Sequence, residues 1–396
     1  MSGLNRNNCR VRNRFISAKA ARPGGRAAQG KAEKPAPRVM QIGGQRPALI
    51  TGGAGFIGTN LADRLLKAGQ PVLIFDNLSR PGVEMNLRWL RSVYGSRVQI
   101  EIGSVCNRRK LRTAVQRAEQ VFHFAAQVAV TTSLENPVHD FDVNTRGTLN
   151  LLEELRSIEN PPPLVFTSTN KVYGGLKNLA LYVNCKRYEP ADSLIRAGIN
   201  EDISLDFHSP YGCSKGAADQ YIIDYARTYG MPATVFRMSC IYGPHQFGTE
   251  DQGWIAHFLI SAIDGRPITI YGDGMQVRDV LYIEYLVDAL LLAQANIQSL
   301  SGQAFNIGGG PANTISLLEL VGIIRALRKE EPRIYFDDRR PGDQKYYVSD
   351  SGKFKAATGW TPKVSAARGV ESLYHWLITS RGAAAAARAS GAERVK

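Results

Sequence analysis

Thr51-Gly52-Gly53-Ala54-Gly55-Phe56-Ile57-Gly58 joins an apolar segment, 48–50, to a helical pattern, 60–66. Its glycines follow the spacing GxxGxxG, which lets the backbone turn tightly, lets a pyrophosphate approach and lets a helix pack closely on a strand. The helix that follows offers unpaired N–H groups and the positive end of its dipole to phosphates. This segment therefore predicts a dinucleotide-binding turn between a strand and a helix.

Further apolar segments alternate with helical patterns along the chain. The segments that we predict as buried strands are 71–76, 98–102, 120–124, 164–168 and 233–237. Strands buried on both faces and separated by helices indicate a parallel sheet covered on both sides. The prediction is an α/β fold: a doubly wound parallel Rossmann sheet with a smaller C-terminal α/β substrate lobe.

The charge of the chain is concentrated at its two ends. Its 396 residues are 44% hydrophobic and 21% charged, which is typical of globular proteins. The net charge is +14, of which residues 1–46 carry +10 and residues 381–396 carry +3, so +1 remains for 47–380. A nearly neutral folded part argues against a nucleic-acid partner. No apolar run approaches the roughly 18 residues that cross a bilayer, so we expect no membrane partner.

The basic segment 1–46 is predicted to be a flexible tail, as is 381–396. Segment 1–46 lacks the apolar core of a secretory signal, although its Arg-rich, acid-poor composition also fits an organelle transit peptide. We hypothesise that it is dispensable and that Met40 is the true start, because the first strand begins at about Ala48. Five scattered cysteines, an odd number, indicate free thiols and a cytoplasmic protein.

Asp76 ends the second predicted strand, 18 residues after Gly58. A carboxylate there accepts hydrogen bonds from the ribose hydroxyls of adenosine and repels a 2′-phosphate, which favours NAD over NADP. Arg80 has two interpretations, because it either favours the 2′-phosphate of NADP or stacks on adenine.

Tyr211-Gly212-Cys213-Ser214-Lys215 places a phenol and an amine one helical turn apart on the same face. A free tyrosine has a pKa of about 10. We expect the ammonium and a positive nicotinamide ring to lower the pKa of Tyr211, so that it takes a proton from an alcohol while hydride leaves the carbon. The alternative is an ordinary pair on a helix surface.

The segment 166–174 begins as a buried strand and continues as Ser168-Thr169-Asn170-Lys171-Val172-Tyr173-Gly174. Its end lies at the carboxyl edge of the sheet, where ligands bind in open α/β folds. Thr169 would point its hydroxyl at the substrate oxygen on which Tyr211 acts. The predicted catalytic residues are Thr169, Tyr211 and Lys215.

Together with the glycine turn, Asp76 and His123–Gln127, these motifs resemble the extended short-chain dehydrogenase/reductase family, also called the NAD-dependent epimerase/dehydratase family. The resemblance covers about residues 47–378. Three further segments are similar to the CDP-tyvelose/CDP-paratose 2-epimerase subfamily, as is the interval of 42 residues from Thr169 to Tyr211. These segments are 168–174, 205–221 and 246–254.

The resemblance implies tightly bound NAD, a nucleotide-sugar substrate and an oligomer. It implies an NAD-binding Rossmann domain at 47–240 and about 279–300, and a sugar-nucleotide-binding lobe at 241–278 and 301–380. The expected cofactor-binding residues are Gly52, Gly55, Phe56, Ile57, Gly58, Asp76, Asn77, Arg80, Ser104, Val105, Ala125, Ala126, Gln127, Asn144, Ser168, Tyr211, Lys215 and Met238. The expected substrate-binding residues are Thr131, Thr169, Gln246, Gln252, Trp254, Arg278 and Arg340.

The two residues after Thr169 bear on the reaction type. Related dehydratases carry Asp-Glu there, and those carboxylates act as general acid and base in the elimination of water. Asn170 and Lys171 stand in their place. We therefore favour an NAD-dependent epimerase that oxidises a sugar carbon and returns the hydride to its other face; the resemblance implies C2 of a CDP-linked 3,6-dideoxyhexose. The alternatives are another nucleotide-sugar 4-epimerase or reductase, a non-catalytic NAD-binding scaffold, and a nucleic-acid binder.

Two arginines, Arg278 and Arg340, occupy positions where the family carries phosphate-binding arginines. Each would donate two hydrogen bonds to phosphate oxygens. A salt bridge of Arg278 with Asp279 is the structural alternative. Cys240 departs from the 4-epimerase pattern, in which an asparagine contacts phosphate, so that contact is in doubt here. Trp254 either borders the substrate or simply packs.

The histidines show no metal-ligand spacing, so we expect no metal site, and His123 is expected to be a hydrogen-bonded core residue. On the predicted helix 211–227, one stripe should support the active site. The outer stripe is expected to form a four-helix contact in a homodimer or homotetramer.

Overall fold

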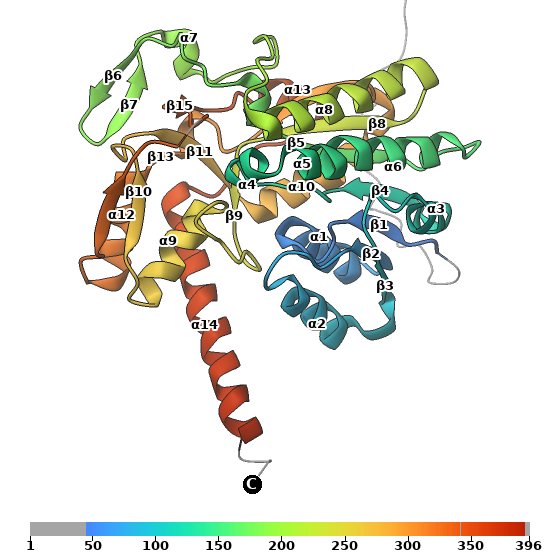
Figure 1. Ribbon diagram of the computed structural model, residues 1–396, viewed down its shortest axis with the longest axis horizontal. Helices are drawn as coiled ribbons and strands as arrows, with labels where there is room; N and C mark the ends of the chain where they lie inside the picture. The colour runs from blue at the N-terminus through green and yellow to red at the C-terminus, as the bar shows by residue number, and fades with distance from the viewer. Residues whose placement is uncertain (1–44, 341, 393–396) are drawn as a thin grey trace, which may run out of the picture. The chain divides into compact units, whose positions relative to one another are not determined.

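The computed structural model describes residues 45–340 and 342–392, the last of them, 382–392, by backbone alone. Its largest element is a seven-stranded parallel sheet with strand order β12-β8-β5-β4-β1-β2-β3 (Figure 1). The strands are β1 (Ala48–Thr51), β2 (Val72–Asp76), β3 (Val98–Ile102), β4 (Gln120–His123), β5 (Leu164–Thr169), β8 (Ala233–Met238) and β12 (Ala304–Ile307). The predicted doubly wound parallel sheet is confirmed, because the order runs outward in both directions from β1 and β4.

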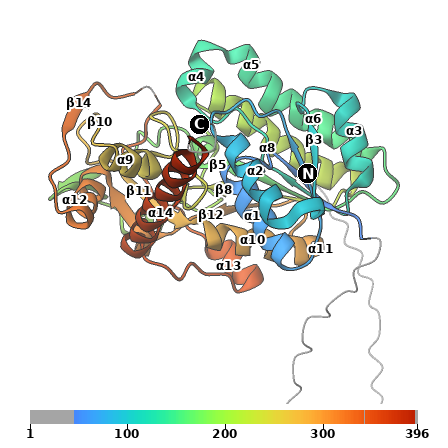
Figure 2. The same cartoon turned by 90° about the horizontal axis from the view of Figure 1, so that it is seen from below.

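Helices cover both faces of this sheet, and Figure 2 shows α6 on one side and α10 on the other. Successive strand residues alternate between the two layers: Ile50 and Ile74 pack with the helices of one face, Leu49 and Leu73 with those of the other. The first layer holds α1 (Phe56–Lys67), α2 (Val83–Tyr94) and α10 (Ile283–Ala295). The second holds α3 (Arg108–Arg117), α6 (Gly147–Arg156) and α8 (Ser209–Tyr229).

A smaller lobe of strands and helices lies on the left in Figure 1. Its central strand, β11, pairs with β9, β13 and β15, and β10 pairs with β14. The strands are β9 (Cys240–Tyr242), β10 (Ile268–Tyr271), β11 (Val277–Tyr282), β13 (Thr314–Ser316), β14 (Ile334–Asp337) and β15 (Tyr346–Tyr347). The helices are α9 (Trp254–Ile263), α12 (Leu317–Arg328) and α14 (Ala366–Ala392), and they share a separate apolar core with the strands.

The predicted domain boundaries depart from the observed elements at two strands. Residues 279–282, assigned above to the Rossmann domain, belong to β11 of the lobe. Residues 304–307, assigned above to the lobe, form edge strand β12 of the large sheet, because β12 pairs in parallel with β8. Helix α14 continues to Ala392, past residue 381, where a flexible tail is predicted. Residues 1–44, which include Met40 and nearly all of the predicted basic tail, lie outside the described residues.

The long interval between Thr169 and Tyr211 folds as an antiparallel hairpin, β6 (Leu181–Asn184) with β7 (Arg187–Pro190), followed by α7 (Ser193–Arg196). Tyr188 of this hairpin donates its backbone N–H to the carbonyl of Met275, which ties the hairpin to the lobe. The remaining short elements are α4 (Val130–Glu135), α5 (Pro137–Phe141), α11 (Ile297–Leu300), α13 (Gly352–Thr358), the 3₁₀ turns η1 (Gly95–Arg97), η3 (Asn170–Tyr173) and η4 (Pro311–Asn313), and the π turn η2 (Asp142–Arg146). Over the described ranges, no helix combines the length and apolar character that crossing a membrane requires.

Candidate active site

A cavity of about 520 Å³ opens beside the glycine turn, at the carboxyl ends of the central strands. All the predicted cofactor-binding residues except Asn144 line it. They come from widely separated segments: the turn and α1, the loop after β2, the loop after β3, the loop after β4, the ends of β5 and β8, and α8. The topology brings these segments together because parallel strands end at the same edge of a sheet.

The glycine turn lets neighbouring backbone segments, and a bound ligand, approach one another closely. Gly52 has φ +68°, and a Cβ there would lie 2.7 Å from the backbone nitrogen of Ala125. A Cβ on Gly58 would lie 2.5 Å from the Cα of Gly53, so only glycine lets α1 start this close to the turn. Gly55 caps α1, and no described side chain accepts a hydrogen bond from the first turn. Gly55, Phe56 and Ile57 line the cavity, so this helix start fits a pyrophosphate.

Asp76 lies on the wall of the same cavity, at the end of β2. Its carboxylate accepts hydrogen bonds from the backbone N–H groups of Ala54 (3.0 Å) and Leu78 (2.8 Å). These bonds connect the acid to the glycine turn and fix its orientation. Burial raises the pKa of Asp76 above its ordinary value, although the backbone hydrogen bonds oppose the shift. Its position fits an acceptor for ribose hydroxyls.

Asn144 differs from the prediction, because it does not line this cavity. Its carboxamide oxygen accepts from the N–H of Gln127, and its nitrogen donates to the carbonyl of Gln127, to Asp140 and to Ser214. Asn144 therefore lies behind the residues that line the cavity, and its hydrogen bonds connect the Gln127 turn to α8.

Tyr211, Lys215 and Thr169 meet at the inner end of the cavity. Tyr211 and Lys215 lie one turn apart on α8 and are 9% and 4% exposed. The Lys215 ammonium donates to the carbonyl of Thr167 at 2.7 Å and lies 4.1 Å from the centre of the Phe166 ring. The hydroxyl of Thr169 lies near enough to that of Tyr211 to lower the pKa of the phenol. The three side chains that the sequence predicts to act together do lie together.

The pKa of Tyr211 in the protein alone is set mainly by burial, whereas the predicted lowering also involves the nicotinamide ring of bound NAD. Burial raises the pKa of Tyr211 to about 12, while the Thr169 hydroxyl and the Arg80 guanidinium lower it and Asp140 raises it. Burial also lowers the pKa of Lys215 to about 7, against the pull of Asp219 and Asp140. Lys215 is thus only partly charged at neutral pH, and the side chains around Tyr211 do not by themselves create a phenolate.

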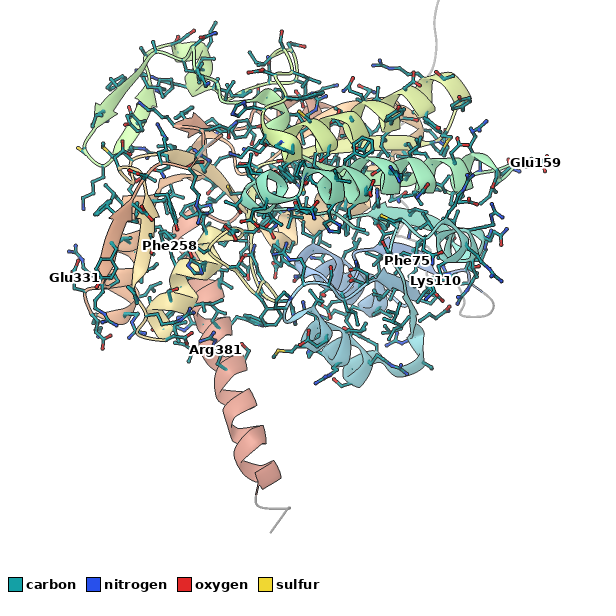
Figure 3. All side chains as sticks on the ribbon, viewed as in Figure 1. Phe75, Lys110, Glu159, Phe258, Glu331 and Arg381 are labelled. Carbon is teal, nitrogen blue, oxygen red and sulfur yellow. The ribbon has the colours of Figure 1, made fainter. Side chains whose placement is uncertain are left out.

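A second cavity, of about 360 Å³, lies between the large sheet and the lobe. Every predicted substrate-binding residue lines it, and Tyr211, Ser168 and Met238 line both cavities. Figure 3 labels one residue of each wall, Phe75 of the first cavity and Phe258 of the second. Tyr211 therefore stands where a molecule in one cavity meets a molecule in the other.

The two predicted phosphate-binding arginines differ in their surroundings. Arg278 is 6% exposed and donates to Asp343 at 2.8 Å and to the carbonyls of Val277 and Gln344, so its partner is not Asp279. Asp279 instead accepts from Ser239 and Ser349. Arg340 lies 3.7 Å from the centre of the Tyr271 ring and 3.5 Å from the carboxylates of both Glu250 and Asp251.

Several buried polar atoms on the wall of the second cavity have no hydrogen-bond partner among the described residues. They are Ser168 Oγ, Thr131 Oγ1, Gln246 Oε1 and Gln276 Oε1. Unpaired buried polar atoms are costly, so their presence on a cavity wall fits a polar ligand. The sequence analysis did not predict Gln276, although its place directly before β11 and two residues before Arg278 was a usable signal.

Two other residues fit their predicted structural interpretations. His123 is fully buried between the hydroxyls of Thr51 (2.6 Å) and Thr148 (3.0 Å), which confirms a hydrogen-bonded core residue. The indole N–H of Trp254 donates to the sulfur of Cys240 at 3.5 Å, so this tryptophan packs and lines the cavity at once. Within residues 45–340 and 342–392 no group of three or more His, Cys, Asp or Glu side chains is arranged to hold a metal ion.

Comparison with known proteins agrees with this geometry. Residues 48–308 match the family model described as the NAD dependent epimerase/dehydratase family. A curated relative, CDP-paratose 2-epimerase of Salmonella typhi, is 43% identical over 335 residues, which are 83% of this chain and 98% of that protein. A dTDP-glucose 4,6-dehydratase of Neisseria meningitidis is 30% identical over 85% of this chain and 94% of its own.

Solved structures with the same fold include two nucleotide-sugar epimerases. UDP-glucose 4-epimerase of Thermotoga maritima, determined with UDP-glucose, has a TM-score of 0.71 and 29% identity, over 84% of this chain and 99% of that one. UDP-glucuronic acid 4-epimerase of Bacillus cereus, in complex with UDP-glucuronic acid and NAD, has a TM-score of 0.72 and 26% identity over the same shares.

Proposed function

Because the chain belongs to the NAD-dependent epimerase/dehydratase family and is therefore an NAD-dependent enzyme, we propose that it epimerises a CDP-linked dideoxysugar at C2, as a CDP-paratose/CDP-tyvelose 2-epimerase. The 43% identity to CDP-paratose 2-epimerase supports the choice of substrate. Asn170 and Lys171, which stand after Thr169, disfavour dehydration because neither supplies a carboxylate.

One observation carries the proposal: Tyr211 lies on the walls of both cavities, and Thr169 lines the second cavity beside it. NAD⁺, when bound, accepts the hydride of a sugar carbon, and NADH returns it. Tyr211 would take the proton of the hydroxyl on that carbon and give it back when the carbon is reduced from its other face. Thr169 would hold the same oxygen, and Lys215 would stabilise the phenolate charge.

The first test combines Tyr211→Phe with an isotope label. Tyr211→Phe should reduce turnover by at least about a thousandfold, because it removes the acid–base group, while the protein still binds NAD. In the unaltered enzyme, deuterium placed on C2 should be recovered on C2 of the product, and solvent deuterium should not enter there. Full activity of the variant, or solvent deuterium at C2, would refute this mechanism. Parallel assays with CDP-, UDP- and GDP-sugars would separate the proposal from a 4-epimerase of another nucleotide sugar.

The proposal includes a cytoplasmic homodimer or homotetramer. Free cysteines, Cys106, Cys185 and Cys213 among them, favour a reducing compartment. The outer face of α8 exposes Tyr221, and the neighbouring α5 exposes Val138 and Phe141. These apolar side chains support the predicted contact between copies through helices, which a light-scattering mass would test.

A further inference from the structure

Lys171 is a half-buried cation in the substrate cavity that the mechanism above does not use. It belongs to η3, directly after β5, and its backbone N–H donates to the hydroxyl of Thr169 at 3.2 Å. Its side chain is 21% exposed and lines the cavity. The same turn therefore positions the catalytic threonine and this amine.

The Lys171 ammonium shares its counter-charge with a second cation. It donates to the carbonyl of Gly342 at 3.1 Å and lies 3.8 Å from Asp343 Oδ1. The same carboxylate oxygen accepts from Arg278 Nη2 at 2.8 Å. The buried Arg278 and the half-buried Lys171 thus face one carboxylate, and Arg278 makes the shorter contact.

This arrangement leaves a local net positive charge among Lys171, Arg278 and Asp343 whenever Lys171 is protonated, whereas Arg340 on the same wall is paired with Glu250 and Asp251. A buried charge without full compensation is costly, so the cluster is most stable when an anion enters. The Cys240 thiol lies near Lys171, and burial raises the pKa of this thiol, so it stays neutral and is a poor donor to phosphate. A nucleotide sugar brings two negative charges on its diphosphate, which matches this wall.

We propose that Lys171 binds the substrate diphosphate together with Arg278 and takes up a proton as the nucleotide sugar enters. This inference rests on the proposed function, because it assigns the residue that recognises the phosphates of that substrate. Lys171 is thereby a binding residue beside the reacting centre and not a second general base.

In the free protein, the pKa of Lys171 is low enough for the amine to take up a proton on binding. Burial lowers the pKa of Lys171 to about 8; Arg278 lowers it further, and Asp343 and Cys240 oppose the shift. About half of the amine is therefore charged at pH 8. We expect the bound diphosphate to keep Lys171 protonated through pH 9. The free protein loses this proton as the pH rises, so binding must then include proton uptake, and the affinity for the nucleotide sugar falls about tenfold from pH 7 to pH 9.

The test measures binding of CDP-glucose, whose diphosphate keeps both charges over this range, by titration calorimetry of the NAD-loaded protein at pH 7, 8 and 9. The unaltered protein should lose about tenfold in affinity and take up about half a proton at pH 8, as seen in two buffers of different ionisation enthalpy. Lys171→Arg should bind without this pH dependence, because a guanidinium stays charged. Lys171→Met should bind at least tenfold more weakly at pH 7.

The matched control Lys177→Met removes an exposed lysine of the same segment and should behave as the unaltered protein does.

Two outcomes would overturn the inference in different ways. If Lys171→Met, or Lys171→Arg where the methionine variant does not fold, keeps the affinity and the pH dependence of the unaltered protein, Lys171 does not bind the diphosphate, and the proposed function stands. If the unaltered protein binds NAD but no CDP-glucose at any pH, the proposed function fails and this inference fails with it.

Discussion

Asp219 and Arg237 form a buried ion pair directly behind the active site. Asp219 lies on α8, one turn after Lys215, and is fully buried, and Arg237 on β8 is 5% exposed. Arg237 donates to the two carboxylate oxygens from Nε and Nη2, each at 3.0 Å, and from Nη1 to the hydroxyl of Tyr173 at 3.2 Å. Asp219→Asn would leave the guanidinium without its counter-charge in a place that water does not reach.

The expected loss in the free energy of unfolding is about 3–5 kcal/mol, because removing one partner of a buried pair strands the other charge. Urea denaturation followed by circular dichroism measures it. The control Asp224→Asn, on the exposed face of the same helix, should stay within about 0.5 kcal/mol. The double variant Asp219→Leu/Arg237→Met should recover most of the loss, because it removes both charges. A loss under about 1 kcal/mol for Asp219→Asn would refute the argument that this pair is desolvated.

Two further predictions concern the cofactor cavity and the core. Gly58→Ala should reduce NAD binding at least tenfold, as measured by fluorescence titration, because its Cβ would lie 2.5 Å from Gly53 Cα; unchanged binding would show that the turn tolerates a side chain. His123 has a folded pKa of about 3, lowered from 6.5 by burial, so its contribution to stability is complete above pH 6.5 and is lost as the pH falls toward 3. In His123→Gln the urea midpoint should fall less steeply between pH 6.5 and 4, and an identical slope would contradict the neutral, buried histidine.

The features that the sequence predicts correctly are those encoded within short segments. The strand at Ala48–Thr51, the glycine turn and the start of α1 follow one another directly, so composition and spacing suffice. Thr169 and Tyr211 are far apart in sequence, but each is anchored to a predicted element, a strand end and a helix start. Since parallel strands end at one edge, their meeting followed from the fold class.

The features that were missed depend on partners that no local pattern specifies. Arg278 pairs with Asp343, 65 residues away, whereas its sequence neighbour Asp279 bonds to two serines. Asn144 carries a residue type suited to cofactor contact, but the chain packs its carboxamide against Gln127. The pKa of Tyr211 depends on how completely the fold removes water from the phenol, and burial outweighs the nearby cations.

The two lysines near Tyr211, Lys171 and Lys215, both have pKa values close to neutral pH, and this has the same consequence for each. A permanently charged guanidinium in this interior needs a carboxylate in the free protein, as Arg278 has in Asp343. An amine with a pKa of about 7 or 8, such as Lys215 or Lys171, can be charged at neutral pH at a cost of at most about 1 kcal/mol. Each can therefore meet an anion that arises during the reaction cycle, the phenolate for Lys215 and the diphosphate for Lys171, because the nearby carboxylates offset the effect of burial on the pKa of each lysine only in part. Replacing either lysine by arginine keeps the positive charge but removes the ability to gain or lose a proton near neutral pH. A substitution that conserves charge at these two positions therefore does not conserve function.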